Sequence, residues 1–215
     1  MKIQKKEFDW ARPLKPLNLS KITAIALHHM EHMTAGMDTI NGWHIGNGWK
    51  GFAYNFWVDF EGNAFECRGL NAGAGLFDPL NDTVISVGFQ GDYDKMEDMP
   101  RAQFITGCEI IRYLKSTIPS INFVAGHRHW QDKSCPGKYF PLGEMIDTAD
   151  KMLTIKDYED ISDWAKGSVL VAVDSGVMIG DDQGQFKPKD YITRQEIAVV
   201  LSRLLDRFPN NRQED

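Results

Sequence analysis

Short apolar segments separated by long connections are the feature that most restricts the fold of this 215-residue chain. Residues 22–29 (ITAIALHH), 83–91 (TVISVGFQG) and 122–126 (NFVAG) are too short for ordinary helices. Each is a continuous or period-two apolar run, as is typical of a buried strand. We therefore predict three buried strands, which must be covered by other elements of the chain.

The connections supply a hairpin and a helix. Residues 52–60 and 64–68 are predicted as two strands joined by a tight turn, with Gly62 and Asn63 providing the turn residues. Pro100 is typical of the first turn of a helix. After it, apolar residues recur at helical spacing: Phe104, Cys108, Ile111, Leu114 and Ile118. The simplest fold with these elements is α/β, a mixed central sheet flanked by helices.

The character of the sequence changes near its last third. We predict one domain over residues 1–152 and a small helical module over 157–208. The module has two helix-like segments joined by a connection rich in Gly, Asp and Pro. Thr193 and Glu196 have the spacing of a capping box, which marks the start of the second helical segment.

Composition excludes several classes of protein. The net charge of −6 argues against a nucleic-acid-binding surface, and no run of 18 apolar residues predicts a membrane span. Residues 1–16 lack the apolar segment of a secretory signal, so we expect synthesis in a cytoplasm. Three cysteines make an odd count, which predicts no disulfide framework. Cys67 and Cys108 are predicted as small buried residues of a strand and a helix, whereas Cys135 has polar neighbours.

The loop at residues 126–137, GHRHWQDKSCPG, concentrates residue types that bind metals. His127 and Cys135 are eight residues apart, far enough for a loop to bring both side chains to one zinc ion. A catalytic zinc site typically has three protein ligands, and His28 or His29 can supply the third. Each residue taken singly also has an ordinary structural explanation, such as a hydrogen-bonded histidine at the rim of the core or a cysteine buried in a loop.

Four separated motifs resemble, in order and spacing, the zinc-dependent N-acetylmuramoyl-L-alanine amidases of the peptidoglycan-recognition type, which include phage endolysins. They are IALHH, WHIGNGWKGFAYNFWVDFEGNAFECRG, VGFQGDY and AGHRHWQDKSCPG, within roughly residues 20–147. The resemblance implies the fold of that family and one catalytic zinc ion held by His28, His127 and Cys135. His29 should then point to the opposite side of its strand, because neighbouring side chains alternate.

The resemblance also implies the reaction and its catalytic residues. Tyr54 in FAYNF matches the family's catalytic tyrosine, and Lys133 matches a lysine two positions before the last zinc ligand. The substrate bond would be the amide between the lactyl group of N-acetylmuramic acid and L-alanine of the stem peptide. Zinc would activate water and polarise the carbonyl. Tyr54 would hold the water or the oxyanion, and Lys133 would place positive charge where negative charge develops.

The chain departs from the family at two positions. Where some relatives have a glutamate base, the alignment places Gly88, or Gln90 if the register shifts, and neither can take a proton. We therefore expect zinc, Tyr54 and Lys133 to suffice. Gly73 stands near the position of a histidine that many relatives have beside the substrate, so contacts there are in doubt.

Two further residues match substrate-binding positions of the family, Arg68 and His44. A salt bridge for Arg68 and a helix cap for His44 explain them equally well. Trp43, Trp49 and Trp57 can line a sugar groove, but we expect core packing for at least two of them.

The C-terminal segment resembles an S-layer homology repeat over residues 157–206. The matching features are Trp164-Ala165, Gly176, Gly180, Gly184-x-Phe186-x-Pro188 and Ile192-Thr193-Arg194-x-Glu196. Such repeats hold secondary cell-wall polymer of Gram-positive bacteria, and Arg194 would contact an anionic group of it, because a guanidinium offers paired donors. The family's sites usually form between three tandem repeats, and this chain has one. It either forms a homo-oligomer, binds weakly, or has become a packing module.

Together these features predict a peptidoglycan hydrolase, most simply a phage or prophage endolysin that lyses Gram-positive bacteria. It would be made in the host cytoplasm without a signal peptide and act at the cell wall after release. A bacterial autolysin is the alternative within the same class of hydrolase. The rival from another class is a recognition protein that binds muropeptide without cutting it. Such relatives typically lose a zinc ligand, whereas all three ligands are present here. A structural surface-layer component would explain only the C-terminal segment.

Overall fold

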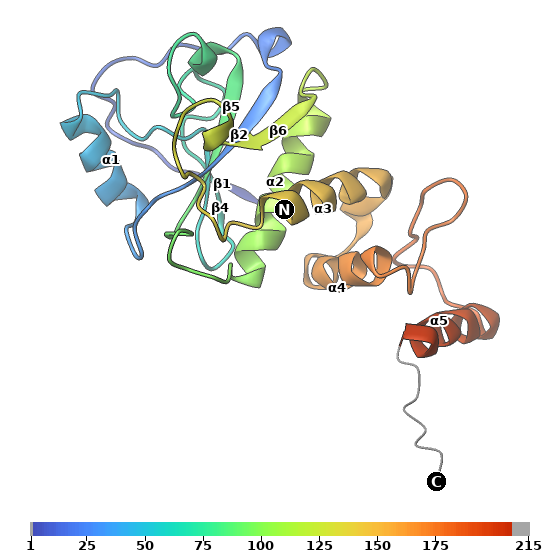
Figure 1. Ribbon diagram of the computed structural model, residues 1–215. Coiled ribbons are helices and arrows are strands. Elements are labelled where there is room, and N and C mark those ends of the chain that lie inside the picture. Colours follow the sequence, from blue (N-terminus) through green and yellow to red (C-terminus); the bar gives the residue numbers. More distant parts are fainter. Residues whose placement is uncertain (1, 208–215) are drawn as a thin grey trace. The chain divides into compact units, whose positions relative to one another are not determined.

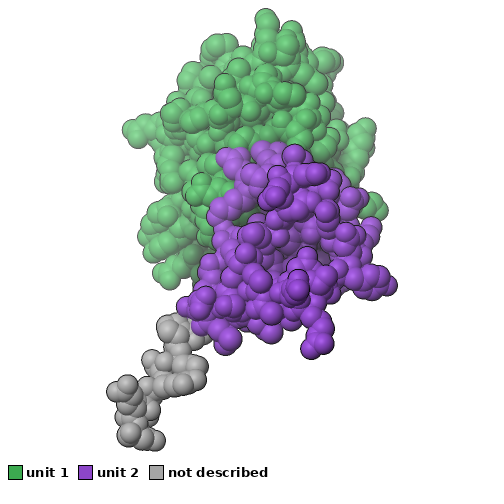
Figure 2. Space-filling view, turned by 90° about the vertical axis from the view of Figure 1, so that its right-hand side faces the viewer, with its two compact units in different colours: residues 1–149 green, residues 150–215 purple. Residues whose placement is uncertain are grey.

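The structure is a computed structural model that describes residues 2–207. Its chain divides into two compact units, residues 1–149 and 150–215, which are coloured separately in Figure 2. The last residue of the predicted C-terminal module, Phe208, lies outside the described residues. No helix among the described residues is both long enough and apolar enough to cross a membrane.

The first unit is built on a six-stranded sheet that contains the five predicted strands and one further strand at Ile3–Lys5 (Figure 1). Its strands lie in the order β1-β4-β3-β5-β2-β6, and only the β3–β4 pair is antiparallel. The strands are β1 (Ile3–Lys5), β2 (Ala24–His29), β3 (Phe56–Val58), β4 (Ala64–Glu66), β5 (Val84–Phe89) and β6 (Phe123–Gly126). The mixed α/β architecture is therefore confirmed.

The three predicted buried strands form neighbours at the centre of this sheet. Strand β2 lies between β5 and β6 and is parallel to both, and every residue of β2 and β5 is buried. The predicted hairpin is β3–β4, and its turn contains Gly62 at φ +79°. Cys67 follows β4 directly instead of lying within a strand, and it is buried as predicted.

Helices cover both faces of the sheet. On one face, helix α2 (Arg101–Thr117) buries Phe104, Cys108, Ile111 and Leu114. Phe56 of β3 faces this helix, where its ring lies 6.5 Å from that of Tyr113. The next residue, Trp57, points to the other face and packs in a cluster with Ile40 of helix α1 (Met37–Gly46). A further helix, α3 (Leu142–Thr154), was not predicted, and it ends across the division between the two units.

The second unit is mostly helical. It contains α4 (Asp163–Asp174) and α5 (Arg194–Arg207) joined by a long connection. The predicted capping box is present at the start of α5: the Thr193 amide and hydroxyl both donate to Glu196 Oε2 at 2.7 Å, and the Glu196 amide donates to Thr193 Oγ1. Helix α5 has no buried residue.

Candidate metal centre and active site

The parallel strands bring the two candidate histidine ligands together. His28 lies near the carboxyl end of β2, and the residue before it, Leu27, is opposite Gly126 at the end of β6. His127 follows Gly126 directly, so it emerges beside His28 at the same edge of the sheet. The two imidazole centroids are 4.6 Å apart. Carboxyl ends of parallel strands are where α/β proteins commonly build their sites.

The loop after β6 returns Cys135 to this edge. The amide of Arg128 donates to the Cys135 carbonyl at 2.8 Å, which closes the loop. Cys135 Sγ lies 3.7 Å from His28 Nδ1, and ligand atoms of His28, His127 and Cys135 all lie within 4.8 Å of one another. Zinc–nitrogen and zinc–sulfur bonds at a tetrahedral angle would hold their donor atoms about 3.5 Å apart. The donor set and its spacing therefore fit one zinc ion.

Burial sets the protonation of this trio. It lowers the pKa of His28 well below its ordinary value, and the neighbouring His127 lowers it further. Burial also lowers the pKa of His127 and raises that of Cys135 to about 12. Without a cation the trio is thus uncharged near neutral pH. A bound cation would favour the Cys135 thiolate, since metal binding and thiol deprotonation are coupled.

A second trio shares Cys135 but is a poorer metal site. Ligand atoms of His29, Glu31 and Cys135 also lie within 4.8 Å of one another. However, His29 Nδ1 accepts the amide hydrogen of Tyr93 at 2.9 Å, so its proton belongs on Nε2, which faces Glu31 at 3.7 Å. Glu31 is exposed, whereas all three members of the first trio are buried. His29 contacts Tyr93 while His28 contacts Tyr54, which places the two histidines on different sides of β2.

Tyr54 lies against the first trio because Gly88 has no side chain. The Tyr54 ring centroid is 5.2 Å from that of His28. In the sheet register, Gly88 stands between His28 and Trp57. A Cβ at Gly88 would come within 2.8 Å of the Tyr54 and Trp57 rings, so no glutamate fits there unless Tyr54 moves. Gln90 is engaged elsewhere, accepting the Phe60 amide at 3.2 Å.

Comparisons with known families agree with this geometry. The family model for N-acetylmuramoyl-L-alanine amidase matches residues 18–138, more than half of the chain. The chain belongs to this amidase family. The S-layer homology domain model matches residues 154–198. We refer to residues 1–149 below as the amidase unit.

Solved structures show that the fold of the amidase unit is shared widely. The N-acetylmuramoyl-L-alanine amidase LysC from Clostridium intestinale URNW matches with a TM-score of 0.63 at 21% identity, over 70% of this chain and 98% of that chain. Bumblebee PGRP-SA matches with a TM-score of 0.58 at 20% identity, over 67% and 93%. The Ph2119 endolysin of a Thermus scotoductus bacteriophage gives 0.53 at 16% identity, over 68% and 97%.

One curated protein matches in sequence, the exoglucanase XynX of Acetivibrio thermocellus. It is 28% identical over 127 residues, which is 59% of this chain. The chain spans about a tenth of the length of that protein.

Lys133 lies at the rim of the amidase site. Its side chain is exposed, and among the described residues it has no hydrogen bond or ion pair. Its charge nevertheless reaches the trio, because it lowers the pKa of both His127 and Cys135. Glu31 acts in the opposite direction on the same two groups, and nothing in the sequence around Glu31 indicated that it lies there.

Arg68 does not form the salt bridge that was one explanation for it. It is buried, and its guanidinium donates to the carbonyl oxygens of Phe52 at 2.7 Å, Ala72 at 2.8 Å and Gly51 at 3.4 Å. Among the described residues it has no carboxylate partner. Gly73, at φ +122°, makes room for this side chain, since a Cβ there would lie 2.5 Å from Arg68 Nη1. A histidine at position 73 would displace Arg68.

His44 lies in the last turn of α1 and does not cap the helix through its imidazole. Its Nδ1 accepts the amide hydrogen of Ala53 at 3.1 Å. This bond fixes the backbone that leads into Tyr54 and strand β3. The other predicted substrate contact, Arg194, is exposed in the second unit.

The protonation of His44 predicts a loss of stability in acid. Burial, with a smaller effect of the Arg68 charge, lowers its pKa to about 4. Between the unfolded pKa of about 6.5 and the folded value, the unfolded chain binds a proton that the folded chain does not, so stability falls as pH falls through this window. We expect a loss of about 2 kcal/mol between pH 7 and pH 4.5 that is absent in His44→Gln. Denaturant unfolding at several pH values measures it; parallel curves for both proteins would contradict it.

The tryptophans are distributed differently from the prediction. Trp57 is 1% exposed and belongs to the core. Trp43 and Trp49 are 42% and 47% exposed, so the expectation that at least two would pack in the core is wrong. The Trp49 ring is tilted by 30° against that of His44, with centroids 4.8 Å apart, on the side of the amidase unit that carries Tyr54.

Proposed function

We propose that the amidase unit hydrolyses the amide between the lactyl group of N-acetylmuramic acid and L-alanine of the stem peptide, using one zinc ion. The observation that carries the proposal is the convergence of His28, His127 and Cys135, from separate parts of the chain, beside Tyr54. Two imidazoles and a thiolate form a three-ligand set that leaves a fourth position for substrate or water.

The chain's own groups complete the proposed chemistry. When bound, zinc would supply Lewis acidity that polarises the scissile carbonyl and makes water acidic enough to attack near neutral pH. Burial and the nearby Cys135 raise the pKa of Tyr54, so its phenol stays protonated and donates a hydrogen bond. The Lys133 ammonium places positive charge at the rim, where it stabilises developing negative charge on the oxygen. Gly88 excludes a carboxylate base from the neighbouring strand, so no such base enters the scheme.

Hydrolysis of purified peptidoglycan tests this proposal. We expect release of peptides with a new amino-terminal alanine, abolished by a chelator and restored by adding zinc. Peptidoglycan recognition protein-LE is among the structural relatives, and binding without cleavage is the alternative outcome. Muropeptide binding without release of peptides would favour that alternative. Chelator-resistant release would reject the role of zinc.

We further infer that the protein acts as an endolysin of phage or prophage origin, lysing Gram-positive bacteria. Support comes from the relatives of the amidase unit, which include the LysCS endolysin of Clostridium intestinale URNW and the Ph2119 endolysin. The second unit would act as the wall anchor through its S-layer homology domain, with domains near residues 1–152 and 157–208. Loss of turbidity of a Gram-positive cell suspension on adding the protein tests this role.

The proposed anchor would bind secondary cell-wall polymer through Arg194 and assemble with further copies. Support for assembly is the apolar surface of α5, where side chains four, seven and eight residues apart are each at least 40% exposed: Ile197, Leu201, Leu204 and Leu205. Retention on purified wall should fall for Arg194→Gln and for residues 1–153 alone. Equal retention of all three proteins would reject the anchor, and sedimentation of the whole chain as a monomer would reject assembly.

A further inference from the structure

A pocket of about 410 Å³ in the amidase unit carries positive charge that the proposed mechanism does not use. Its lining contains four cations and two carboxylates: Arg12, Lys15, Lys50, Arg68, Asp78 and Asp82. The whole chain has a net charge of −6, so this excess of cations is local. The four cations exceed the two carboxylates by two positive charges, and a hollow with an excess of one sign of charge concentrates ions of the opposite sign.

Arg68 gives the floor of this pocket a cation without a counter-ion. It is 5% exposed, and three of its five N–H donors bind the backbone carbonyls of Phe52, Ala72 and Gly51, while the Trp10 ring lies 5.2 Å from its guanidinium carbon. Burial lowers its pKa to about 10, so the guanidinium is still charged at neutral pH. Buried charges in proteins are normally paired. An anion in the pocket would supply the missing partner.

The segment before residue 18, where the family match begins, supplies another wall. Arg12 donates to the Gly48 carbonyl at 2.8 Å, and Lys50 donates to the Pro13 carbonyl at 3.1 Å. These bonds hold the segment against the amidase unit and leave both cations without an acidic partner among the described residues.

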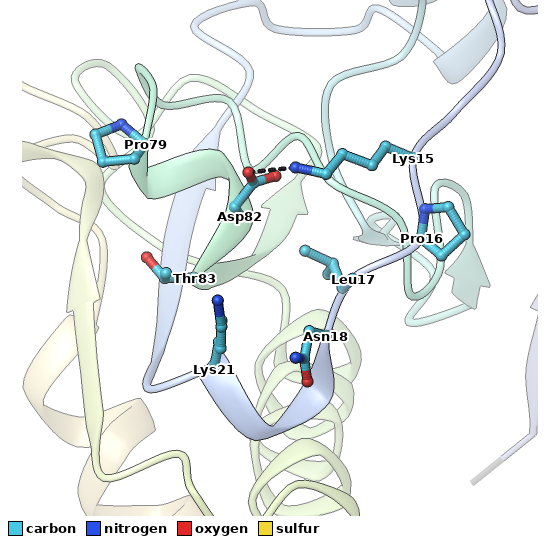
Figure 3. Close-up of a pocket in the computed structure, with 8 residues that line it drawn as sticks. All are labelled: Lys15, Pro16, Leu17, Asn18, Lys21, Pro79, Asp82 and Thr83. Atoms are coloured by element: carbon cyan, nitrogen blue, oxygen red, sulfur yellow. Dashed lines mark hydrogen bonds and ion pairs between the residues drawn. The ribbon is translucent and has the colours of Figure 1, made fainter.

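Lys15 differs from these two cations, because it forms an ion pair with Asp82. The two side chains reach toward each other across the gap between the segment and the loop before β5 (Figure 3). They line the pocket of about 290 Å³ drawn there as well as the cationic one, so the pair stands between the two. Arg12, Lys50 and Arg68 have no carboxylate partner among the described residues, and each keeps N–H donors that a ligand could use.

The cationic pocket borders the catalytic residues. Ala53, next to Tyr54, lines it, and so does Gly75. A Cβ at Gly75 would touch His28 at 3.4 Å and Tyr54 at 3.5 Å, so these rings lie directly behind the pocket wall. The scissile amide joins a glycan part and a peptide part of the substrate, which are called its two arms below. A substrate with this amide at the candidate metal centre would extend one of the two arms into the pocket.

The charge of the pocket selects the peptide arm. The glycan arm is neutral, because the lactyl carboxyl of muramic acid is consumed in the scissile amide. The first free carboxylate of the stem peptide lies on its second residue, a glutamate, one Cα–Cα step of about 3.8 Å beyond alanine. We propose that the pocket binds this α-carboxylate and that Arg12 and Lys50 make the chain selective for it. The inference rests on the proposed amide hydrolysis for the direction of the substrate.

Two substrates that differ only at this group test the inference. They are N-acetylmuramyl-L-alanyl-D-glutamate and its α-carboxamide, N-acetylmuramyl-L-alanyl-D-isoglutamine. For the whole chain we expect KM for the acid to be lower by about tenfold, as for one charge-assisted contact. Arg12→Met and Lys50→Met should each raise KM for the acid toward that for the amide with little change in kcat.

Lys5→Met is the matched control, because Lys5 lies in the same N-terminal segment, pairs with Glu7 at 2.7 Å and does not line the pocket. It should keep the preference for the acid. Equal KM values of the wild type for acid and amide, or an unchanged preference in both variants, would overturn the inference. Binding of L-alanyl-D-glutamate, followed by tryptophan fluorescence, is measured in parallel. If hydrolysis fails but the dipeptide still binds and Arg12→Met weakens that binding, the proposed function is rejected and the role of the pocket in carboxylate binding is supported.

Discussion

Cys135→Ser is expected to remove zinc and hydrolytic activity together. Serine would offer a hydroxyl that stays protonated, whereas the zinc site requires a thiolate. Zinc content should fall from about one ion per chain to nearly none, and the rate by at least about 10³-fold, because the ion supplies several kcal/mol of transition-state stabilisation. Metal analysis, release of amino-terminal alanine from peptidoglycan, and melting temperatures with and without zinc measure the three effects.

Cys67→Ser is the matched control for this prediction. Cys67 is also a free buried cysteine whose pKa is raised by burial, and it packs in the cluster around Phe52 and Trp57. Its replacement should lower stability without removing zinc, so a melting temperature that still rises with zinc is expected. Retention of zinc and full activity in Cys135→Ser would show that the trio is not the metal centre.

Cys135 belongs to both trios, so its replacement cannot tell whether zinc binds with His28 and His127 or with His29 and Glu31. His28→Asn should lose zinc as Cys135→Ser does, whereas Glu31→Gln should keep it. The reason is that His29 Nδ1 is occupied by the Tyr93 amide and Glu31 is exposed. The reverse pattern would move the ion to the His29 side of β2.

The sequence was sufficient to predict the parts of the fold whose signal is local. Periodicity located α2, and uninterrupted apolar runs located β2, β5 and β6. Strand β1 has only three residues, Ile3–Lys5, none of them buried, and it exists because β4 offers a partner 61 residues away. Helix α3 carries a signal that the predictions above do not use, since Met145, Ala149 and Met152 are all buried at helical spacing.

The residues of the site also divide into those with a local sequence signal and those without one. His28, His127 and Cys135 lie in motifs, and the strand register then explains why they converge. The cationic pocket has no local signal, because Arg12 and Arg68 come together only through the wrapping of the N-terminal segment. The sequence allows a salt bridge for Arg68 and a helix cap for His44. Neither forms among the described residues, because backbone carbonyls accept from Arg68 and a backbone amide donates to His44.

Lys133→Met should separate catalysis from metal binding. The side chain is exposed and unpaired among the described residues, so its loss should change neither the zinc content nor the melting temperature. Loss of one preorganised donor to an oxyanion costs about 3–4 kcal/mol, so kcat should fall by about 10²- to 10³-fold. Lys138→Met is the control, since Lys138 is exposed in the same loop and lies over the Tyr139 ring at 4.5 Å. Equal kcat values for both variants would reject the role of Lys133.

Tyr54→Phe removes the other proposed donor while keeping the ring that packs on His28 and Trp57. If the protonated phenol donates to the oxyanion, kcat should fall by about 10²-fold, and the double variant with Lys133→Met should lose less than the product of the two single effects. That coupling is expected because both donors act on one oxygen. Strict multiplicativity would mean that the two side chains act at different atoms, and full activity of Tyr54→Phe would limit the role of Tyr54 to packing.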